Sequence, residues 1–282
     1  MRILLTNDDG IYAPGLAALE KSLRRLGDVT VVAPLKEQSG VAHAITFLTP
    51  LQVRKVYVND KHWAWTVDGT PADCVKLAIS AIMPEPPDLV VSGINDGHNA
   101  GANAYYSGTL GAAIEGAFSG ITSVGVSLKH QENAPFHRAA DLAVGIIDKI
   151  LKQNAPPGLL YSINIPLPVL KHDAPEVRIV PLADSHFWET FECRTDTVGR
   201  SYYWFTGRPD PRQPSKKKES EQMTDLDALA QGYISVTPLK FDATDRQHLQ
   251  EMATWDLNPD ANRTSCGAEH TGPKVRISWR GE

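Results

Sequence analysis

Residues 1–10 read MRILLTNDDG, and this stretch sets the expectation for the whole fold. The apolar run Ile3–Leu5 has the length of a buried strand, and the turn signal Asn7–Gly10 follows it. The run is too short for a signal peptide or a membrane span. We therefore expect a buried strand whose carboxyl end carries two adjacent acids, Asp8 and Asp9.

Short apolar runs alternate with amphipathic segments from residue 1 to about residue 165. The pattern predicts strands at 3–5, 29–33, 88–92, 122–127 and 160–165, a hairpin-like pair at 51–58 and 62–67, and helices at 14–26, 71–82, 108–118 and 135–152. Strands separated by helices of this length are typical of a mostly parallel sheet with right-handed crossovers. The expected fold class is α/β, with helices on both faces of the sheet and the site at the carboxyl ends of the strands.

The chain from 167 to 240 has a different pattern. It predicts β-structure at 177–181, 187–192, 201–206 and 233–237, a helix at 224–230 and an exposed loop at 207–220. Aromatic residues concentrate at 202–205. We interpret this region as a β-rich arm at about 183–215 on a single domain of residues 1–255, followed by a C-terminal extension at 256–282 with one possible strand at 275–279.

Composition excludes several classes of protein. Hydrophobic residues make up 42% and charged residues 22% of the 282 residues, which is typical of a globular protein and not of a disordered one. The formal net charge of -5 argues against bulk binding to nucleic acid or to an anionic membrane. No stretch approaches about 18 uninterrupted apolar residues. The three cysteines are widely spaced and predict neither a disulfide framework nor a zinc site, which favours a cytoplasmic location.

The acid pair Asp8 and Asp9 is the first candidate for chemistry. Two adjacent carboxylates at the edge of a sheet repel each other unless a cation or a proton lies between them. A hard divalent metal ion is the natural solution. The alternative is that Asn7–Gly10 forms only a polar turn.

Two further loops follow predicted strands. Ser39, in APLKEQSG at 33–40, could present its hydroxyl at the same edge. SGINDGHNAG at 92–101 carries Asn95 and Asn99 among glycines, and it leads to the start of a predicted helix at Ser107, Gly108 and Thr109. Free amides at a helix start suit an anion, whereas the alternative is an N-cap by Ser107 or Thr109. No Walker A or dinucleotide fingerprint is present.

Together these loops offer oxygen donors without clustered Cys or His, which favours Mg²⁺, Mn²⁺ or Ca²⁺ over zinc. In its motifs, the sequence resembles the survival protein SurE family of metal-dependent nucleotide phosphatases. The resemblance rests on NDDG at 7–10, APLKEQSG at 33–40, VDGTPADCV at 67–75, SGINDGHNAG at 92–101, YSGTLGAAIEG at 106–116, SINIP at 162–166 and GYISVTPL at 232–239. It spans about residues 1–250 and leaves 256–282 outside.

The resemblance implies a Rossmann-like α/β domain with a β-hairpin region used in homodimer or homotetramer assembly. It implies one divalent metal ion per subunit, Mg²⁺ or Mn²⁺, with the ligands Asp8, Asp9, Ser39 and Asn95. The phosphate-contacting residues would be Asn95, Asn99, Ser107, Gly108 and Thr109. Members of the family release phosphate from nucleoside 5′- and 3′-monophosphates, and some also trim short polyphosphate.

These inferences predict metal-assisted hydrolysis of a phosphomonoester, with Asp8 and Asp9 as the catalytic pair. The proton acceptor for the attacking water stays open between Asp8, Asp9 and a metal-bound hydroxide. There are two rival interpretations: a nucleotide-binding regulatory module without turnover, and a purely structural α/β protein.

Three further polar residues have simpler explanations. A helix N-cap explains Thr70 and Asp73 without chemistry, and a lone histidine such as His43 is usually structural or solvated.

Overall fold

In a computed structural model, the described residues are 1–153, 155–184, 189–209 and 222–257. They divide into two compact units. The first comprises residues 1–188 and 211–241, and the second comprises 189–210 and 242–282.

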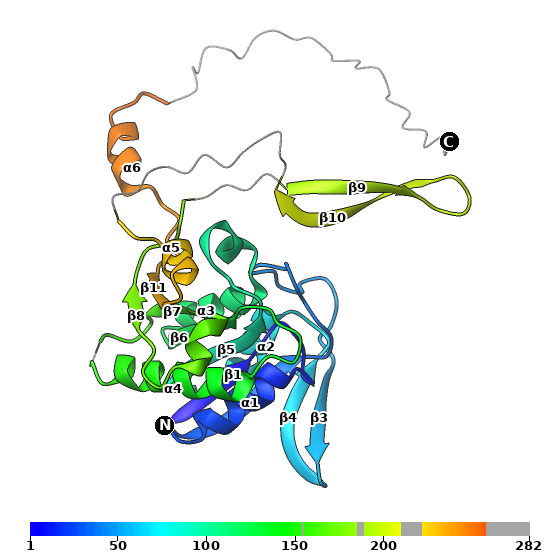
Figure 1. The fold of residues 1–282 in the computed structure, drawn as a ribbon, viewed down its shortest axis with the longest axis vertical. Coiled ribbons are helices and arrows are strands. Elements are labelled where there is room, and N and C mark those ends of the chain that lie inside the picture. Colours follow the sequence, from blue (N-terminus) through cyan, green and yellow to red (C-terminus); the bar gives the residue numbers. More distant parts are fainter. Residues whose placement is uncertain (154, 185–188, 210–221, 258–282) are drawn as a thin grey trace, which may run out of the picture. The chain divides into compact units, whose positions relative to one another are not determined.

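The first unit is built on a nine-stranded sheet in the order β3-β4-β2-β1-β5-β6-β7-β11-β8 (Figure 1). The strands are β1 Arg2–Thr6, β2 Asp28–Pro34, β3 Val53–Val58, β4 Lys61–Val67, β5 Leu89–Asp96, β6 Thr122–Leu128, β7 Leu160–Ile165, β8 Val177–Ile179 and β11 Ile234–Leu239. Neighbours from β4 through β7 pair in parallel, as do β11 and β8. The antiparallel pairs are β3 with β4 and β11 with β7.

Helices cover both faces of this sheet. They are α1 Pro14–Leu23, α2 Pro71–Leu77, α3 Gly108–Phe118, α4 Phe136–Leu151 and α5 Asp225–Ala230, with short helical segments η1 Ala78–Ile82, η2 Gly101–Tyr106 and η3 Leu167–Lys171. Along β1, Ile3 and Leu5 pack into the larger hydrophobic cluster with α1 and α4, whereas Leu4 packs into a second cluster with α2 and α3. Successive side chains of a strand point to opposite faces of the sheet. Because both faces are covered here, β1 is apolar at successive positions.

The second unit contains a two-stranded antiparallel hairpin and one helix. The hairpin is formed by β9 Glu189–Thr195 and β10 Ser201–Pro209, and the helix is α6 Arg246–Met252. Its aromatic side chains are exposed at Phe191 and at Tyr202, Tyr203, Trp204 and Phe205.

The structure confirms the predicted fold class, and the predicted elements agree with it within a few residues at their ends. The predicted helix at 71–82 is divided into α2 and η1, and the sequence interpretation missed α6. The possible strand at 275–279 lies outside the described residues, as does nearly all of the extension at 256–282. Of the predicted loop at 207–220, residues 207–209 belong to β10 and the rest lie outside the described residues. The assignment of residues 1–255 to a single domain stays a prediction.

None of the helices among the described residues is long and apolar enough to cross a membrane. Two of the cysteines, Cys74 and Cys193, are free thiols in this part of the chain. The predicted cytoplasmic location stays a prediction.

Candidate functional site

The candidate site lies where parallel strands of the sheet reach their carboxyl ends. Strands β4, β2, β1 and β5 are adjacent and parallel, so the loops that follow them meet at one edge. Asp8 and Asp9 follow β1, and Ser39 follows β2. Asn95 is the second-to-last residue of β5. The order of the strands therefore places these predicted residues along a single edge.

Asp8 is nearly buried, at 4% exposure, and its carboxylate is held from the start of α3. The Thr109 hydroxyl donates to Asp8 Oδ1 at 2.5 Å. Asn99 Nδ2 in turn donates to Thr109 Oγ1 at 3.2 Å and to Ser127 Oγ at 2.9 Å. This chain of hydrogen bonds links the end of β1, the loop after β5, the start of α3 and β6, and so it fixes the orientation of the Asp8 carboxylate.

Burial raises the pKa values of both acids, and the charge of Asp8 raises the pKa of Asp9 further. Desolvation by burial raises the pKa of Asp8 above 3.8, and the hydrogen bond from Thr109 opposes the shift. Burial, followed by the charge of Asp8, raises the pKa of Asp9 to about 7. Asp96 and Glu37 are further carboxylates that repel a charge on Asp9. The pair is thus an electronegative site that a cation would stabilise.

The loop after β2 meets the loop after β1 through the backbone. The Gln38 amide donates to the Asp8 carbonyl oxygen at 2.7 Å. The neighbouring residue Ser39 is exposed, and its hydroxyl donates to Glu37 Oε1 at 2.6 Å. The structure therefore brings the backbone beside Ser39 to Asp8, while the Ser39 hydroxyl itself is paired with Glu37.

Asn95 and Asp96 bring the end of β5 to Asp9. The Asp96 amide donates to Asp9 Oδ2 at 3.2 Å, and Asn95 Nδ2 donates to the Gly97 carbonyl at 2.8 Å. The latter bond uses the donor of the Asn95 amide group and leaves its oxygen as the atom suited to a cation. His98 is directed elsewhere, because its Nε2 lies 3.0 Å from the carbonyl oxygen of Ile165.

The three predicted residues at the start of α3 have different roles. Ser107 is the N-cap, and its hydroxyl accepts a hydrogen bond from the Leu110 amide at 3.1 Å. The Thr109 hydroxyl instead donates a hydrogen bond to Asp8 Oδ1. A Cβ on Gly108 would lie 2.9 Å from the Asp8 Cβ and 3.1 Å from the Gln38 carbonyl oxygen. Glycine is therefore required where the helix packs against Asp8, and a larger residue would disturb the acid pair and the helix start together.

The sequence interpretation missed several polar partners of this site. Asn164 Oδ1 accepts from the Asn99 amide at 2.8 Å, and Asn164 Nδ2 donates to the Asn99 carbonyl and to Ser162 Oγ. Asn164 and Ser162 belong to the motif SINIP, so the motif was the available signal. Ser127, the other partner of Asn99, lies in a run of the sequence that indicates only a strand.

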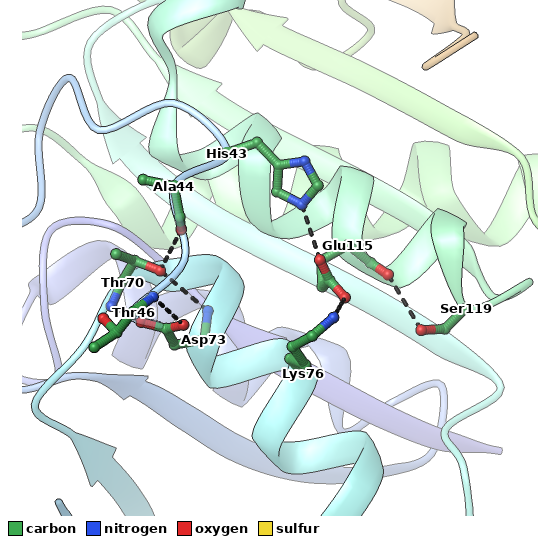
Figure 2. A network of polar contacts seen from close by, with 8 residues as sticks. All are labelled: His43, Ala44, Thr46, Thr70, Asp73, Lys76, Glu115 and Ser119. Carbon is green, nitrogen blue, oxygen red and sulfur yellow. Dashed lines mark hydrogen bonds and ion pairs between the residues drawn. The ribbon is translucent and has the colours of Figure 1, made fainter. Parts of the chain in front are cut away.

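A polar network fastens the loop at 41–46 to α2 and α3, as Figure 2 shows. Glu115 of α3 is nearly buried and lies 2.9 Å from His43 Nε2 and 2.7 Å from Lys76 Nζ. Thr70 and Asp73 form a capping box at the start of α2, which confirms the prediction of an N-cap. His43 thus has a structural partner, as a lone histidine usually has. The network holds the loop that follows Ser39 against the body of the sheet.

The donors available at the edge fit a divalent cation. Among the described residues, no three His, Cys, Asp or Glu side chains come together as a metal-binding group. The donor set is a mixed one, with two carboxylates from Asp8 and Asp9 and neutral oxygens from Asn95 and the Ser39 loop. Repulsion between adjacent acids and an oxygen-only donor set are the properties that suit Mg²⁺ or Mn²⁺.

Fold and site together define an α/β protein with an acidic, oxygen-donor site at the carboxyl edge of a parallel sheet. The family model "Survival protein SurE" matches residues 3–189, and the chain belongs to this family. A 5′-nucleotidase SurE from Rhodopirellula baltica is 47% identical over 92% of this chain and 100% of the relative. A 5′-nucleotidase SurE from Chlorobium phaeobacteroides is 41% identical over 90% of this chain and 96% of the relative. The crystal structure of the SurE protein from Aquifex aeolicus superposes with a TM-score of 0.73 and 36% identity, covering 89% of this chain and 98% of that one.

Thr109→Val tests the hydrogen bonds that hold Asp8. Because Thr109 is fully buried and its hydroxyl joins Asn99 to Asp8, the variant should lose about 1–3 kcal/mol of unfolding free energy in urea. Thr66→Val is the matched control, since the buried Thr66 hydroxyl has no hydrogen-bond partner among the described residues. Equal stability changes in the two variants would show that the Thr109 hydroxyl does not hold the acid.

The raised pKa of Asp9 makes a prediction for the metal-free protein. Because the folded pKa, about 7, lies above the ordinary value of 3.8, the protonated carboxyl favours the folded state, and stability falls as the pH rises from about 4 through 7. Asp9→Asn should remove this loss and raise the midpoint of thermal unfolding at pH 8 much more than at pH 5, with chelator present throughout.

The exposed Asp173 provides the control substitution, Asp173→Asn. This substitution should leave the midpoint of thermal unfolding unchanged at both pH 5 and pH 8. If the Asp9→Asn variant is no more stable than the wild type at pH 8, the charge on Asp9 does not destabilise the folded protein, which would contradict the prediction.

Proposed function

We propose that this protein is a metal-dependent phosphomonoester hydrolase that acts on nucleoside 5′-monophosphates. The observation that carries the proposal is the adjacent acid pair at the carboxyl edge of the sheet, with Asp8 buried and Asp9 half-buried, in a chain whose relatives bear the name 5′-nucleotidase over nearly their full length. We extend the proposal to nucleoside 3′-monophosphates and short polyphosphate, as the sequence resemblance implies.

The carboxylates of Asp8 and Asp9 would hold one Mg²⁺ or Mn²⁺ ion, with oxygens from Asn95 and Ser39 completing the set. The Ser39 hydroxyl donates its hydrogen to Glu37, so the lone pairs of its oxygen stay available to the ion. When bound, such an ion lowers the pKa of a coordinated water and neutralises charge on a phosphoryl oxygen. Thr109 and Asn99 orient Asp8, so that its lone pairs point in a fixed direction before any ligand arrives.

The start of α3 would contribute to the binding of the phosphate. An 11-residue helix directs the positive end of its dipole toward the acid pair, and Ser107 already satisfies the amide of Leu110. Gly108 keeps the backbone of this helix start close to Asp8. A phosphate held here would therefore lie beside the carboxylates.

The rival of a different class is a regulatory module that binds nucleotide and metal without turnover. The names of the relatives and the adjacent acid pair favour the enzyme. Both interpretations predict binding of a nucleotide, and they differ only in the release of phosphate.

Asp8→Asn and Asp9→Asn should each lower the release of phosphate from AMP by at least about a hundredfold at saturating Mn²⁺ or Mg²⁺, because each removes a charged metal ligand. The measurement is a colorimetric phosphate assay on the full chain, with chelator-treated wild type as the metal-free reference. Asp173→Asn, on the exposed surface, should retain wild-type turnover.

Metal-independent release of phosphate by the wild type would contradict the metal requirement. Near wild-type turnover in both variants would contradict the assignment of the acid pair. Binding of AMP without any release of phosphate would favour the regulatory module.

We also propose that the protein is a homodimer or homotetramer that assembles through the β9–β10 hairpin. Four consecutive aromatic residues of β10 are between 41% and 65% exposed, which is unusual for a two-stranded hairpin in water. Phe191 and Phe205 lie in register across the hairpin, with ring centroids 5.5 Å apart. A second copy of the chain would bury this aromatic surface.

Multi-angle light scattering at micromolar concentration should therefore give the mass of a dimer or tetramer. The double substitution Trp204→Glu and Phe205→Glu should shift the mass toward the monomer, because it places charge on the proposed contact. A clean monomer in the wild type would contradict the proposal.

A further inference from the structure

A histidine and an aspartate pair at the same edge of the sheet, and the proposed mechanism uses neither side chain. Asp96 is the last residue of β5, and His130 lies two residues beyond the end of β6. The His130 Nδ1 atom lies 2.9 Å from Asp96 Oδ2. Because β5 and β6 are parallel neighbours, with Asp96 opposite Leu128 in register, the pair belongs to the carboxyl edge that carries the acid pair.

Asp96 is the direct link between His130 and the acid pair. Its backbone amide donates to Asp9 Oδ2 at 3.2 Å, while its carboxylate holds the imidazole of His130. Burial and the charge of Asp8 raise the pKa of Asp9 most, and the charge of Asp96 adds to them. A single residue therefore separates the imidazole from Asp9, beside which the phosphate of a substrate would lie.

Hydrolysis of a nucleoside monophosphate needs a proton at the leaving oxygen. When the bond between phosphorus and the 5′ oxygen breaks, an alkoxide forms, and an alkoxide is a poor leaving group unless it receives a proton. The attacking and leaving oxygens lie on opposite sides of the phosphorus in such a displacement. The group that removes a proton from the water is therefore not the group that protonates the leaving oxygen.

Among the described residues, three histidines lie in loops that follow strands at this edge. His43 Nε2 lies 2.9 Å from Glu115 Oε2, and His98 Nε2 lies 3.0 Å from the Ile165 carbonyl oxygen. Burial also lowers the pKa of His98 below 6.5, which favours the neutral ring. The His130 side chain is 72% exposed and is held through Nδ1, so its Nε2 is the nitrogen available to a substrate.

We propose that His130, oriented by Asp96, is the general acid that gives a proton to the leaving oxygen of the nucleoside. A carboxylate beside Nδ1 fixes a hydrogen on that nitrogen, so Nε2 is the atom that gains and loses the catalytic proton. Asp96 is a positioning residue in this arrangement, because it touches the imidazole and not the substrate. The inference rests on the proposed function, and it adds the second proton transfer of the same reaction.

The proton transfer accompanies an ordinary hydrolysis. The oxygen of the attacking water forms a bond to phosphorus, and the bond from phosphorus to the 5′ oxygen breaks. The electron pair of the broken bond stays on the 5′ oxygen, which takes the proton from Nε2 of the His130 imidazolium. The water loses a proton to its acceptor at the acid pair, and solvent returns a proton to His130. The products are the nucleoside and inorganic phosphate.

The test compares two substrates that share the phosphate and differ in the leaving oxygen. AMP releases an alkoxide, which needs a proton, whereas p-nitrophenyl phosphate releases a stable phenolate, which does not. In single turnovers of the full chain at saturating Mn²⁺, His130→Gln should lower the rate for AMP by at least about a hundredfold and keep the rate for p-nitrophenyl phosphate within about threefold of the wild type. The KM for AMP should stay near the wild-type value, because a proton donor acts in the transition state.

Asp96→Asn tests the positioning of the imidazole. It should lower the rate for AMP by a smaller factor than His130→Gln does, since the Asn oxygen can still accept from Nδ1, and it should change the rate for p-nitrophenyl phosphate less. His62→Gln is the matched control, because His62 is an exposed histidine at the amino end of β4, away from this edge. It should keep both wild-type rates, and the midpoint of thermal unfolding confirms that each variant is folded.

Equal losses for the two substrates in His130→Gln would show that the residue shapes the site and does not donate a proton, which would overturn the inference. An unchanged rate for AMP, with or without a higher KM, would also overturn it. Both results leave the phosphatase proposal intact. A wild type that releases phosphate from neither substrate would overturn the proposed function itself, so the two failures are distinguishable.

Discussion

The repulsion between two adjacent carboxylates, Asp8 and Asp9, is the constraint on which the rest of this site depends. Both follow a buried strand, where desolvation raises both pKa values and the charge of Asp8 raises the pKa of Asp9 further. A fold can keep such a pair only if other interactions hold it in place. The compensating interactions come from the loop after β2, the end of β5 and the start of α3.

The start of α3 supplies the most direct of these interactions. Thr109 donates to Asp8, and Gly108 allows the helix to approach closely enough for that bond to form. Asn99 connects Thr109 to β6 through Ser127, and its backbone is held by Asn164 of β7. The acid is thus oriented by a network that runs across the adjacent strands β1, β5, β6 and β7. Because the orienting groups are themselves buried and paired, the geometry exists before any ligand binds.

Much of this could be predicted from the sequence, because the signals are local. The apolar runs and helix periods predicted the α/β class, and NDDG after the first strand located the acid pair. Thr70 and Asp73 lie three positions apart, so their capping box could also be predicted from local spacing.

The remaining features depend on contacts between distant segments. Thr109 and Asp8 are 101 residues apart, and nothing in the local pattern distinguishes a hydroxyl that caps a helix from one that holds an acid. The hydrogen bonds that join the loop at 41–46 to Thr70 and Asp73 likewise connect segments that the local pattern does not bring together. The pairing of Ser39 with Glu37 is a choice of side-chain orientation that only the structure describes. Strand order and side-chain direction are therefore what sequence reasoning lacked.

The central claim is that Asp8 and Asp9 together bind one divalent cation. Anomalous scattering from a crystal of the full chain grown with Mn²⁺ tests it most directly, because manganese is located independently of the protein atoms. We expect one peak per chain, within bonding distance of oxygens from both carboxylates. The absence of a peak at saturating Mn²⁺, or a single peak away from both acids, would contradict it.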